Sequence, residues 1–250
     1  MPSERSRKWL TLLAMTGSLS MIMIDQTVVS VALPRIQRDL DLSQSGLQWV
    51  MNAYILALAA TVAAGGRLGD ILGRRRAFVG GVILFAGASA ACGMAGSAAG
   101  LIGARVLQGI AAAFMQPASA AIVTGTFPLG ERGRAMAVYA GVAMSMMAMG
   151  PLLGGAITEF LSWRWVFWIN LPVAAAAVTL ALLFCRAPER SSRETVDFRG
   201  LVLLVLGMPA LVLGIQQGNG FGWTSALTMG LILGGLVLIG LLVRVESGVE

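Results

Sequence analysis

The sequence contains no histidine and only two cysteines in 250 residues. The lack of histidine removes the side chain that most often transfers protons near neutral pH, and also the commonest metal ligand. Cys92 and Cys185 both lie inside apolar stretches and are too few for a disulfide framework or a metal cluster. No nucleophile–base constellation and no phosphate-binding loop of the G-x-x-x-x-G-K-[ST] type is present. We therefore expect no metal, no cofactor and no enzymatic activity.

Charge is also scarce in this chain. Asp, Glu, Lys and Arg make up 12% of the residues, whereas soluble domains carry about 25%. Hydrophobic residues make up 57%, and the mean hydropathy is +0.80. The net charge of +6 does not indicate nucleic-acid binding, because the basic residues separate apolar runs instead of clustering on a soluble face. The composition predicts an all-α integral membrane protein whose surroundings are the lipid bilayer.

The apolar runs are long enough to cross a bilayer, which takes about 20 residues of helix. A basic segment, SERSRK, precedes the first run and resembles the start of a signal peptide. The run that follows is too long for a signal peptide and lacks a convincing cleavage site, so we expect an uncleaved first helix. The sequence predicts eight spans, at 9–33, 47–66, 77–97, 100–125, 135–157, 165–185, 200–217 and 225–243.

The basic residues are distributed unevenly between the two sides of these spans. With the N-terminus inside, 14 of the 18 Lys and Arg residues fall on the cytoplasmic side, three fall outside and Arg105 lies within a span. Short loops follow the positive-inside rule, which places both termini in the cytoplasm of a multi-pass protein of the inner (plasma) membrane.

One hydrophilic connection divides the chain. We expect a six-helix bundle at 1–185, a cytoplasmic linker at 186–199, and two additional transmembrane helices with a short cytoplasmic tail at 200–250. The six helices can themselves be read as two triplets, because the first and the fourth spans each carry one ionisable residue. Inverted repeats of this kind are typical of secondary transporters.

Those two ionisable residues are Asp25 and Arg105. A charge at bilayer depth costs at least about 2.5–3.5 kcal/mol, so it is rare without a partner or a task. Both positions fall in the outer half of the membrane, about 12 Å and 8 Å from its outer side at 1.5 Å per residue. Adjacent helices would let the side chains meet. They would then form either a structural ion pair or a protonatable carboxylate that loads and releases a proton as its partner moves.

The stretch GGRLGDILGRRRAF, residues 65–78, resembles a signature of the major facilitator superfamily, specifically of its fourteen-span drug:proton antiporters. The family pattern is G-x-L-[A/G]-D-[R/x]-x-G-[R/K]-[R/K], located at the cytoplasmic turn between helices two and three. Ile71 stands where the family often has a basic residue. The alternative interpretation is a set of positive-inside anchors, which needs neither the aspartate nor the glycines. The resemblance implies a cytoplasmic gate that holds the outward-facing state closed, formed by Arg67, Asp70, Arg74 and Arg75, with Gly66, Gly69 and Gly73 permitting tight packing.

Other segments are similar to the same family. IDQTVVSVALP, residues 24–34, resembles its first-helix motif, and LIGARVLQGIAAA, residues 101–113, resembles the fourth-helix motif in which the arginine is linked to proton transfer. These likenesses imply that Asp25 and Arg105 couple transport to protons. GPLLGG matches the core of the antiporter motif in the fifth helix, associated with export, although a simple packing kink explains it equally well. That motif supplies Gly150, Pro151, Gly154 and Gly155.

The resemblance implies a secondary active transporter that exports small drug-like, amphiphilic or cationic molecules in exchange for protons. Its partners would be the substrate, protons and the bilayer. In this family two six-helix halves rock against each other, and the sequence ends at Glu250, where a second half is expected. The alternative is a truncated or half-transporter without transport activity of its own. It would act at most as a membrane assembly partner, for a separate C-terminal half or in a homo-oligomer.

Overall fold

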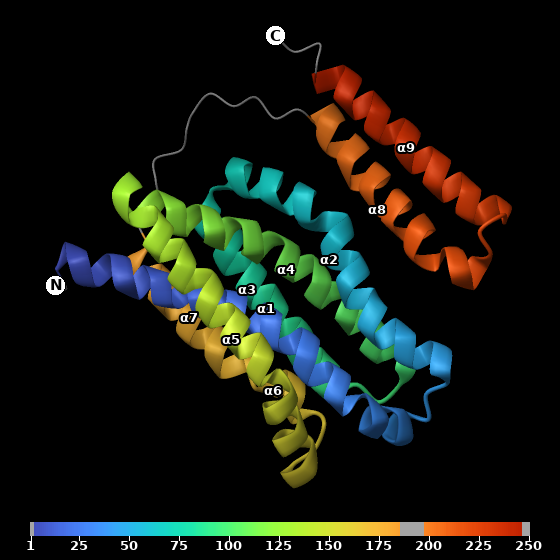
Figure 1. Ribbon diagram of the computed structural model, residues 1–250, viewed down its shortest axis with the longest axis horizontal. Coiled ribbons are helices and arrows are strands. Elements are labelled where there is room, and N and C mark those ends of the chain that lie inside the picture. The colour runs from blue at the N-terminus through green and yellow to red at the C-terminus, as the bar shows by residue number, and fades with distance from the viewer. Residues whose placement is uncertain (1–2, 186–197, 247–250) are drawn as a thin grey trace.

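The computed structural model describes residues 3–185 and 198–246, and these fold into helices joined by short connections (Figure 1). The helices are α1 Glu4–Leu40, α2 Gln44–Leu72, α3 Arg74–Met94, α4 Ala98–Thr126, α5 Leu129–Phe160, α6 Trp165–Trp168, α7 Asn170–Phe184, α8 Phe198–Phe221 and α9 Ala226–Glu246. The all-helical prediction is confirmed for the described residues.

Serine caps set the beginning of three of these helices. The hydroxyl oxygens of Ser3, Ser43 and Ser97 each accept a hydrogen bond from the backbone N–H three residues later, which satisfies one of the unpaired donors at a helix start. At the other end of α1, Asp41 adopts the left-handed conformation, with φ 49°, and stops the helix. The helices run beyond the expected spans because polar residues continue them outside the hydrocarbon.

Seven of the described helical segments are long and apolar enough to cross a membrane, and α6 and α7 together form one of them. The expected spans at 9–33, 47–66, 77–97, 100–125, 135–157, 165–185 and 225–243 correspond to these seven. The remaining one, 200–217, is helical as part of α8, but its apolar stretch, Val202–Gly218, is shorter than the others. The predicted linker at 186–199 lies outside the described residues except for its last two positions.

The packing of the first seven helices follows the symmetry expected of two triplets. Helix α2 packs on α4 as α5 packs on α1, and α3 packs on α4 as α7 packs on α1. The two triplets, α1–α3 and α4–α7, therefore contact each other symmetrically: α1 corresponds to α4, α2 to α5, and α3 to α7. Helices α8 and α9 form a hairpin that packs on the rest of the described chain through α2, and Figure 1 shows it to one side of the bundle.

Two glycine contacts bring α2 and α4 close together. A Cβ added to Gly65 of α2 would lie 2.2 Å from the carbonyl oxygen of Ala113, and one added to Gly109 of α4 would lie 2.3 Å from that of Tyr54. Any side chain at these positions would push the backbones apart, so α2 and α4 pack by the small-residue contacts typical of membrane helices.

The two ends of the bundle differ in charge. At one end, a cavity is lined by the first turns of α1, the start of α3, the α4–α5 connection and the end of α7. At the other end, Arg164 binds Asp39 at the end of α1 and the carbonyl oxygen of Ala95 after α3. The predicted cytoplasmic arginines of 1–185 lie at the first end. This grouping of the arginines agrees with the expectation that successive spans cross the membrane in opposite directions.

Candidate functional site

Asp25 and Arg105 meet inside the bundle, as their predicted depths allowed. Arg105 Nη1 donates to Asp25 Oδ2 across 2.5 Å, and both side chains are fully buried. Asp25 comes from the middle of α1 and Arg105 from the second turn of α4, two helices that contact each other at the centre of the bundle. Arg105 is the largest fully buried side chain among the described residues.

Further polar side chains surround this pair and extend it to neighbouring helices. Gln108, one turn after Arg105 on the same face of α4, accepts from Arg105 Nη1 at 2.9 Å and donates to Asp25 Oδ1 at 3.3 Å. The Gln108 amide also donates to Ser89 of α3 at 2.7 Å, and its carbonyl oxygen accepts from the thiol of Cys92 at 3.3 Å. We call the whole set the polar network: Asp25, Tyr54, Ser89, Cys92, Arg105, Gln108 and Asn170.

Helices α2 and α7 complete the polar network. The guanidinium of Arg105 lies 4.3 Å from the ring centre of Tyr54, and its Nε donates to the carbonyl oxygen of Val50 at 3.1 Å. Asn170 at the start of α7 donates to Ser89 at 3.4 Å. The network therefore links α1, α2, α3, α4 and α7, and a change of charge at its centre acts on five helices.

Two polar atoms of the network have no hydrogen-bond partner within the described residues: Arg105 Nη2 and the Tyr54 hydroxyl. A buried polar group without a partner costs about 1–3 kcal/mol, so the centre of the network is not fully compensated. A buried ion pair itself contributes little to stability, but losing one partner leaves a charge unpaired and costs about 3–5 kcal/mol.

The predicted cytoplasmic gate lies at the α2–α3 junction, but most of it is helical and not a turn. Gly66, Arg67, Gly69 and Asp70 belong to the last two turns of α2, and only Gly73, with φ 92°, separates α2 from α3. The chain can reverse within one residue because glycine tolerates this conformation. A Cβ at Gly66 or Gly69 would make only ordinary contacts, at 3.7 and 3.5 Å. The expected tight packing instead falls on Gly65.

The arginines of the gate have different contacts. Arg74 Nε binds Asp70 Oδ1 at 3.2 Å. The two residues are four positions apart, and both side chains are exposed. Arg75 Nη2 donates to the carbonyl oxygen of Leu182 at 2.6 Å, in the last turn of α7. A cation is favourable there because the last carbonyls of a helix carry partial negative charge. Arg67 is exposed. These contacts join the ends of α2, α3 and α7.

The glycine–proline motif of α5 faces α1. Pro151 has no N–H, so the carbonyl oxygen of Met147 loses its usual partner, and Thr27 of α1 donates to this oxygen at 3.1 Å. A Cβ on Gly150 would lie 1.8 Å from Thr27 Oγ1, and one on Gly154 would lie 3.0 Å from the carbonyl oxygen of Val28. Gly150 and Gly154 therefore form the α1–α5 contact. Nothing lies within 4 Å of a Cβ on Gly155, and Pro151 is exposed.

Sequence reasoning missed part of the polar network. The i, i+3 spacing of Arg105 and Gln108 indicates a shared face, but Tyr54, Ser89 and Asn170 come from three other helices and carry no spacing signal. Cys92, for which the sequence predicted no role, donates a hydrogen bond to Gln108. A buried Ser or Asn on a membrane helix is the signal that could have found them, since such groups need partners.

Residues 15–248 match the family described as the Major Facilitator Superfamily. The chain belongs to this superfamily. It is 39% identical over 229 residues to the tetracenomycin C resistance and export protein of Streptomyces glaucescens, a match that covers 91% of this chain and 43% of that protein. It is 38% identical over 249 residues to the puromycin resistance protein of Streptomyces alboniger, a match that covers 98% of this chain and 48% of that protein. The chain thus spans about half the length of these relatives.

Solved structures of the Major Facilitator Superfamily share the fold. An inward-facing bacterial homolog of the human lysosomal transporter Spinster aligns with a TM-score of 0.60 and 21% identity, covering 95% of this chain and 60% of that one. The peptide-transporter family member PepTSo aligns with a TM-score of 0.66 and 11% identity, covering 99% and 55%. At these identities the likeness concerns the fold alone.

Proposed function

We propose that this superfamily member is the N-terminal half of a proton-coupled exporter of small drug-like, amphiphilic or cationic molecules. The observation that carries the proposal is the fully buried Asp25–Arg105 pair, which lies at the centre of five helices. The relatives include antibiotic resistance and export proteins, which supports export and not import.

In the proposed mechanism, a proton that reaches Asp25 neutralises its carboxylate and weakens the ion pair to Arg105. Arg105 is then a buried charge without its counter-ion. An arrangement of the helices that gives Arg105 a new partner therefore has a lower free energy than the original one. Release of the proton restores the pair. Rocking of two six-helix halves exposes a central cavity to each side in turn, so the transport cycle is assigned to this half together with a second half.

We further propose that the protein belongs to the fourteen-span subgroup and lies in the inner membrane with both termini in the cytoplasm. Support for the subgroup comes from α8 and α9, which follow the six-helix bundle as a hairpin. Support for the orientation comes from the concentration of arginines at the end of the bundle that contains the α2–α3 junction. The gate role of Arg67, Asp70, Arg74 and Arg75 rests on this orientation.

A second candidate is a half that inserts and assembles but does not transport. The described residues contain one six-helix bundle, whereas rocking of this kind needs two. In this case the chain would form a stoichiometric complex with a second six-helix half or with another copy of itself. The mass of the solubilised chain, with and without a co-expressed second half, tests this candidate.

The transport proposal is tested by efflux of a fluorescent cationic dye from cells that express this chain together with a second six-helix half. We expect efflux that stops when a protonophore collapses the proton gradient, and an Asp25→Asn variant that exports at least about tenfold more slowly, because removing a positioned proton-transfer group costs about 10²–10⁴-fold in comparable chemistry.

The matched control is Asp41→Asn, which removes the same charge from an exposed position just after α1. Asparagine tolerates the left-handed conformation of this residue, so efflux should stay at the level of the unchanged chain. Equal efflux from the Asp25→Asn variant would refute proton coupling through Asp25. Correct insertion of both halves without any efflux would refute the transport proposal and favour the second candidate.

A further inference from the structure

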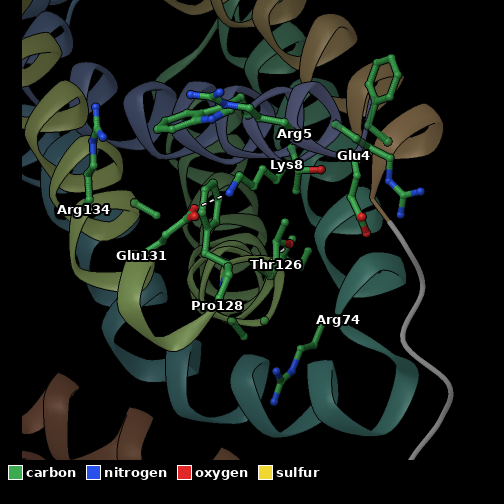
Figure 2. A pocket seen from close by; sticks show the side chains of 17 residues that line it. Glu4, Arg5, Lys8, Arg74, Thr126, Pro128, Glu131 and Arg134 are labelled. Atoms are coloured by element: carbon green, nitrogen blue, oxygen red, sulfur yellow. Dashed lines mark hydrogen bonds and ion pairs between the residues drawn. The ribbon is translucent and has the colours of Figure 1, made fainter. Parts of the chain in front are cut away.

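A cavity of about 1020 Å³ lies at the arginine-rich end of the bundle, away from the polar network. Its walls come from the first turns of α1, the start of α3, the end of α4, the start of α5 and the end of α7. Figure 2 shows Lys8, Glu131 and Thr126 around this space, with Arg134 on α5 at one side and Arg74 on α3 at another. None of the transport steps proposed above uses this cavity.

The charge of the cavity lining is strongly positive. Five cationic side chains and two carboxylates line it: Arg5, Arg7, Lys8, Arg74 and Arg134 against Glu4 and Glu131. Lys8 forms an ion pair with Glu131, drawn as a dashed line in Figure 2. The cations of the lining outnumber its carboxylates, so the cavity attracts an anion.

Aromatic rings hold two of these cations in place. The rings of Trp9 and Phe127 pack edge to face with centres 5.6 Å apart. The guanidinium of Arg134 lies 5.9 Å from the Trp9 ring centre, and Lys8 Nζ lies 5.4 Å from that of Phe127. Cations over aromatic faces are attracted to them, so the rim presents ordered charges and not only mobile ones.

Two exposed residues of α1 indicate that the cavity lies where the helices leave the hydrocarbon. Trp9 is 36% exposed, and Leu13, one turn deeper on the same face of α1, is 60% exposed. Tryptophan is enriched at the headgroup level of membranes, and an exposed leucine beneath it indicates contact with acyl chains. An anion that fits both surfaces has a charged head and an apolar tail.

We propose that this cavity binds the phosphate headgroup of an anionic phospholipid, held mainly by Arg5 and Arg134. Guanidinium groups bind phosphate oxygens with paired, charge-assisted hydrogen bonds, and basic clusters at the cytoplasmic surface attract anionic lipids. The proposal rests on the proposed orientation of the chain but not on transport. Lipid bound here would tie the start of α1 to the start of α5, next to the proposed gate.

The test is lipid binding by the purified full chain, measured by native mass spectrometry with phosphatidylglycerol and with zwitterionic phosphatidylcholine. We expect a clear preference for phosphatidylglycerol in the unchanged chain. The double variant Arg5→Gln/Arg134→Gln should bind phosphatidylglycerol about 25-fold more weakly, from about fivefold for each lost cation near the membrane surface. Binding of phosphatidylcholine should not change.

The control variant Arg35→Gln/Arg38→Gln removes the same charge at the opposite end of the bundle and should bind phosphatidylglycerol within twofold of the unchanged chain. Equal weakening by the control would overturn the proposal in favour of general charge attraction. Competition by soluble glycerol phosphate as effective as the lipid would show that the site takes free phosphate, and would overturn the lipid assignment.

A second pair of measurements tests the proposal even if the glutamine variant does not fold. The variant Arg5→Lys/Arg134→Lys keeps the charge and should retain most of the preference, and the unchanged chain alone must distinguish the two lipids. Absence of that distinction overturns the proposal without any variant. The readout is binding, so a chain that binds the lipid but exports no dye would contradict only the proposed transport function.

Discussion

The contact between α1 and α5 depends on single atoms at Gly150 and Thr27. Pro151 frees the carbonyl oxygen of Met147, and the hydroxyl of Thr27 occupies the position that a side chain at residue 150 would need. The glycine and the proline therefore act together: Gly150 leaves space for the Thr27 hydroxyl, and Pro151 frees the carbonyl oxygen that accepts its hydrogen bond. This is a physical reason for the glycine–proline pair that does not depend on the direction of transport.

Replacement of Gly150 by alanine should destabilise the bundle by about 1–3 kcal/mol, because overpacking a close contact forces neighbouring atoms to shift. The added Cβ would lie 2.6 Å from the Thr27 Cβ, which rotation of the side chain does not move. Unfolding in detergent measures the loss. Gly155→Ala on the same helix is the control, since its Cβ meets nothing within 4 Å, and an equal loss there would contradict this explanation.

Helices α2 and α3 are nearly one continuous element that is folded back at Gly73. The residue has φ 92° and ψ 127°, which is outside the conformations that other residues adopt easily, and its missing Cβ would meet nothing. The backbone conformation alone, and not the packing, therefore requires glycine here. The junction holds Asp70 and Arg74 within one turn of each other across the break.

The variant Gly73→Ala should lower the free energy of unfolding by about 1–3 kcal/mol, the cost of holding a non-glycine residue in such a conformation. Thermal unfolding in detergent measures it. Gly80→Ala, an exposed position inside α3 with open space around its Cβ, should instead stabilise the protein by about 0.5–1 kcal/mol. Stabilisation by both substitutions would show that residue 73 is not strained.

The whole bundle has one strongly basic end and one end with few cations. The basic end contains the start of α1, the α2–α3 junction and the α4–α5 connection. The opposite end contains Arg35 paired with Glu159 and Arg164 paired with Asp39. Because basic loops stay in the cytoplasm, this asymmetry fixes the expected orientation of the gate and of the lipid cavity.

Cysteine labelling tests the orientation in a chain with Cys92→Ala and Cys185→Ala. Gly130→Cys at the basic end and Leu161→Cys at the opposite end both place the thiol at an exposed position. A membrane-impermeant maleimide should modify position 161 in intact cells and position 130 only after the membrane is opened. The reverse pattern would place the arginine-rich junction outside and refute the gate.

Much of the site was predictable because hydrocarbon penalises charge so strongly. The depths of Asp25 and Arg105 along two helices predicted that they could meet if the helices were adjacent, and the structure places them in contact. The extent of the polar network was not predictable, because Tyr54, Ser89 and Asn170 converge from separate helices. The interpretation of the α2–α3 junction as a turn was also inaccurate, since residues 66–72 continue the helix.

The sequence by itself determined the membrane class, the approximate helices and the gathering of basic residues at one end of the bundle, because these depend on the local cost of placing apolar or charged groups in lipid. Only the tertiary structure decided which helices pack together. It placed the close approach at Gly65 and not Gly66, assembled five helices around one guanidinium, and enclosed a basic cavity. These features depend on contacts between residues far apart in the chain, which no local pattern encodes.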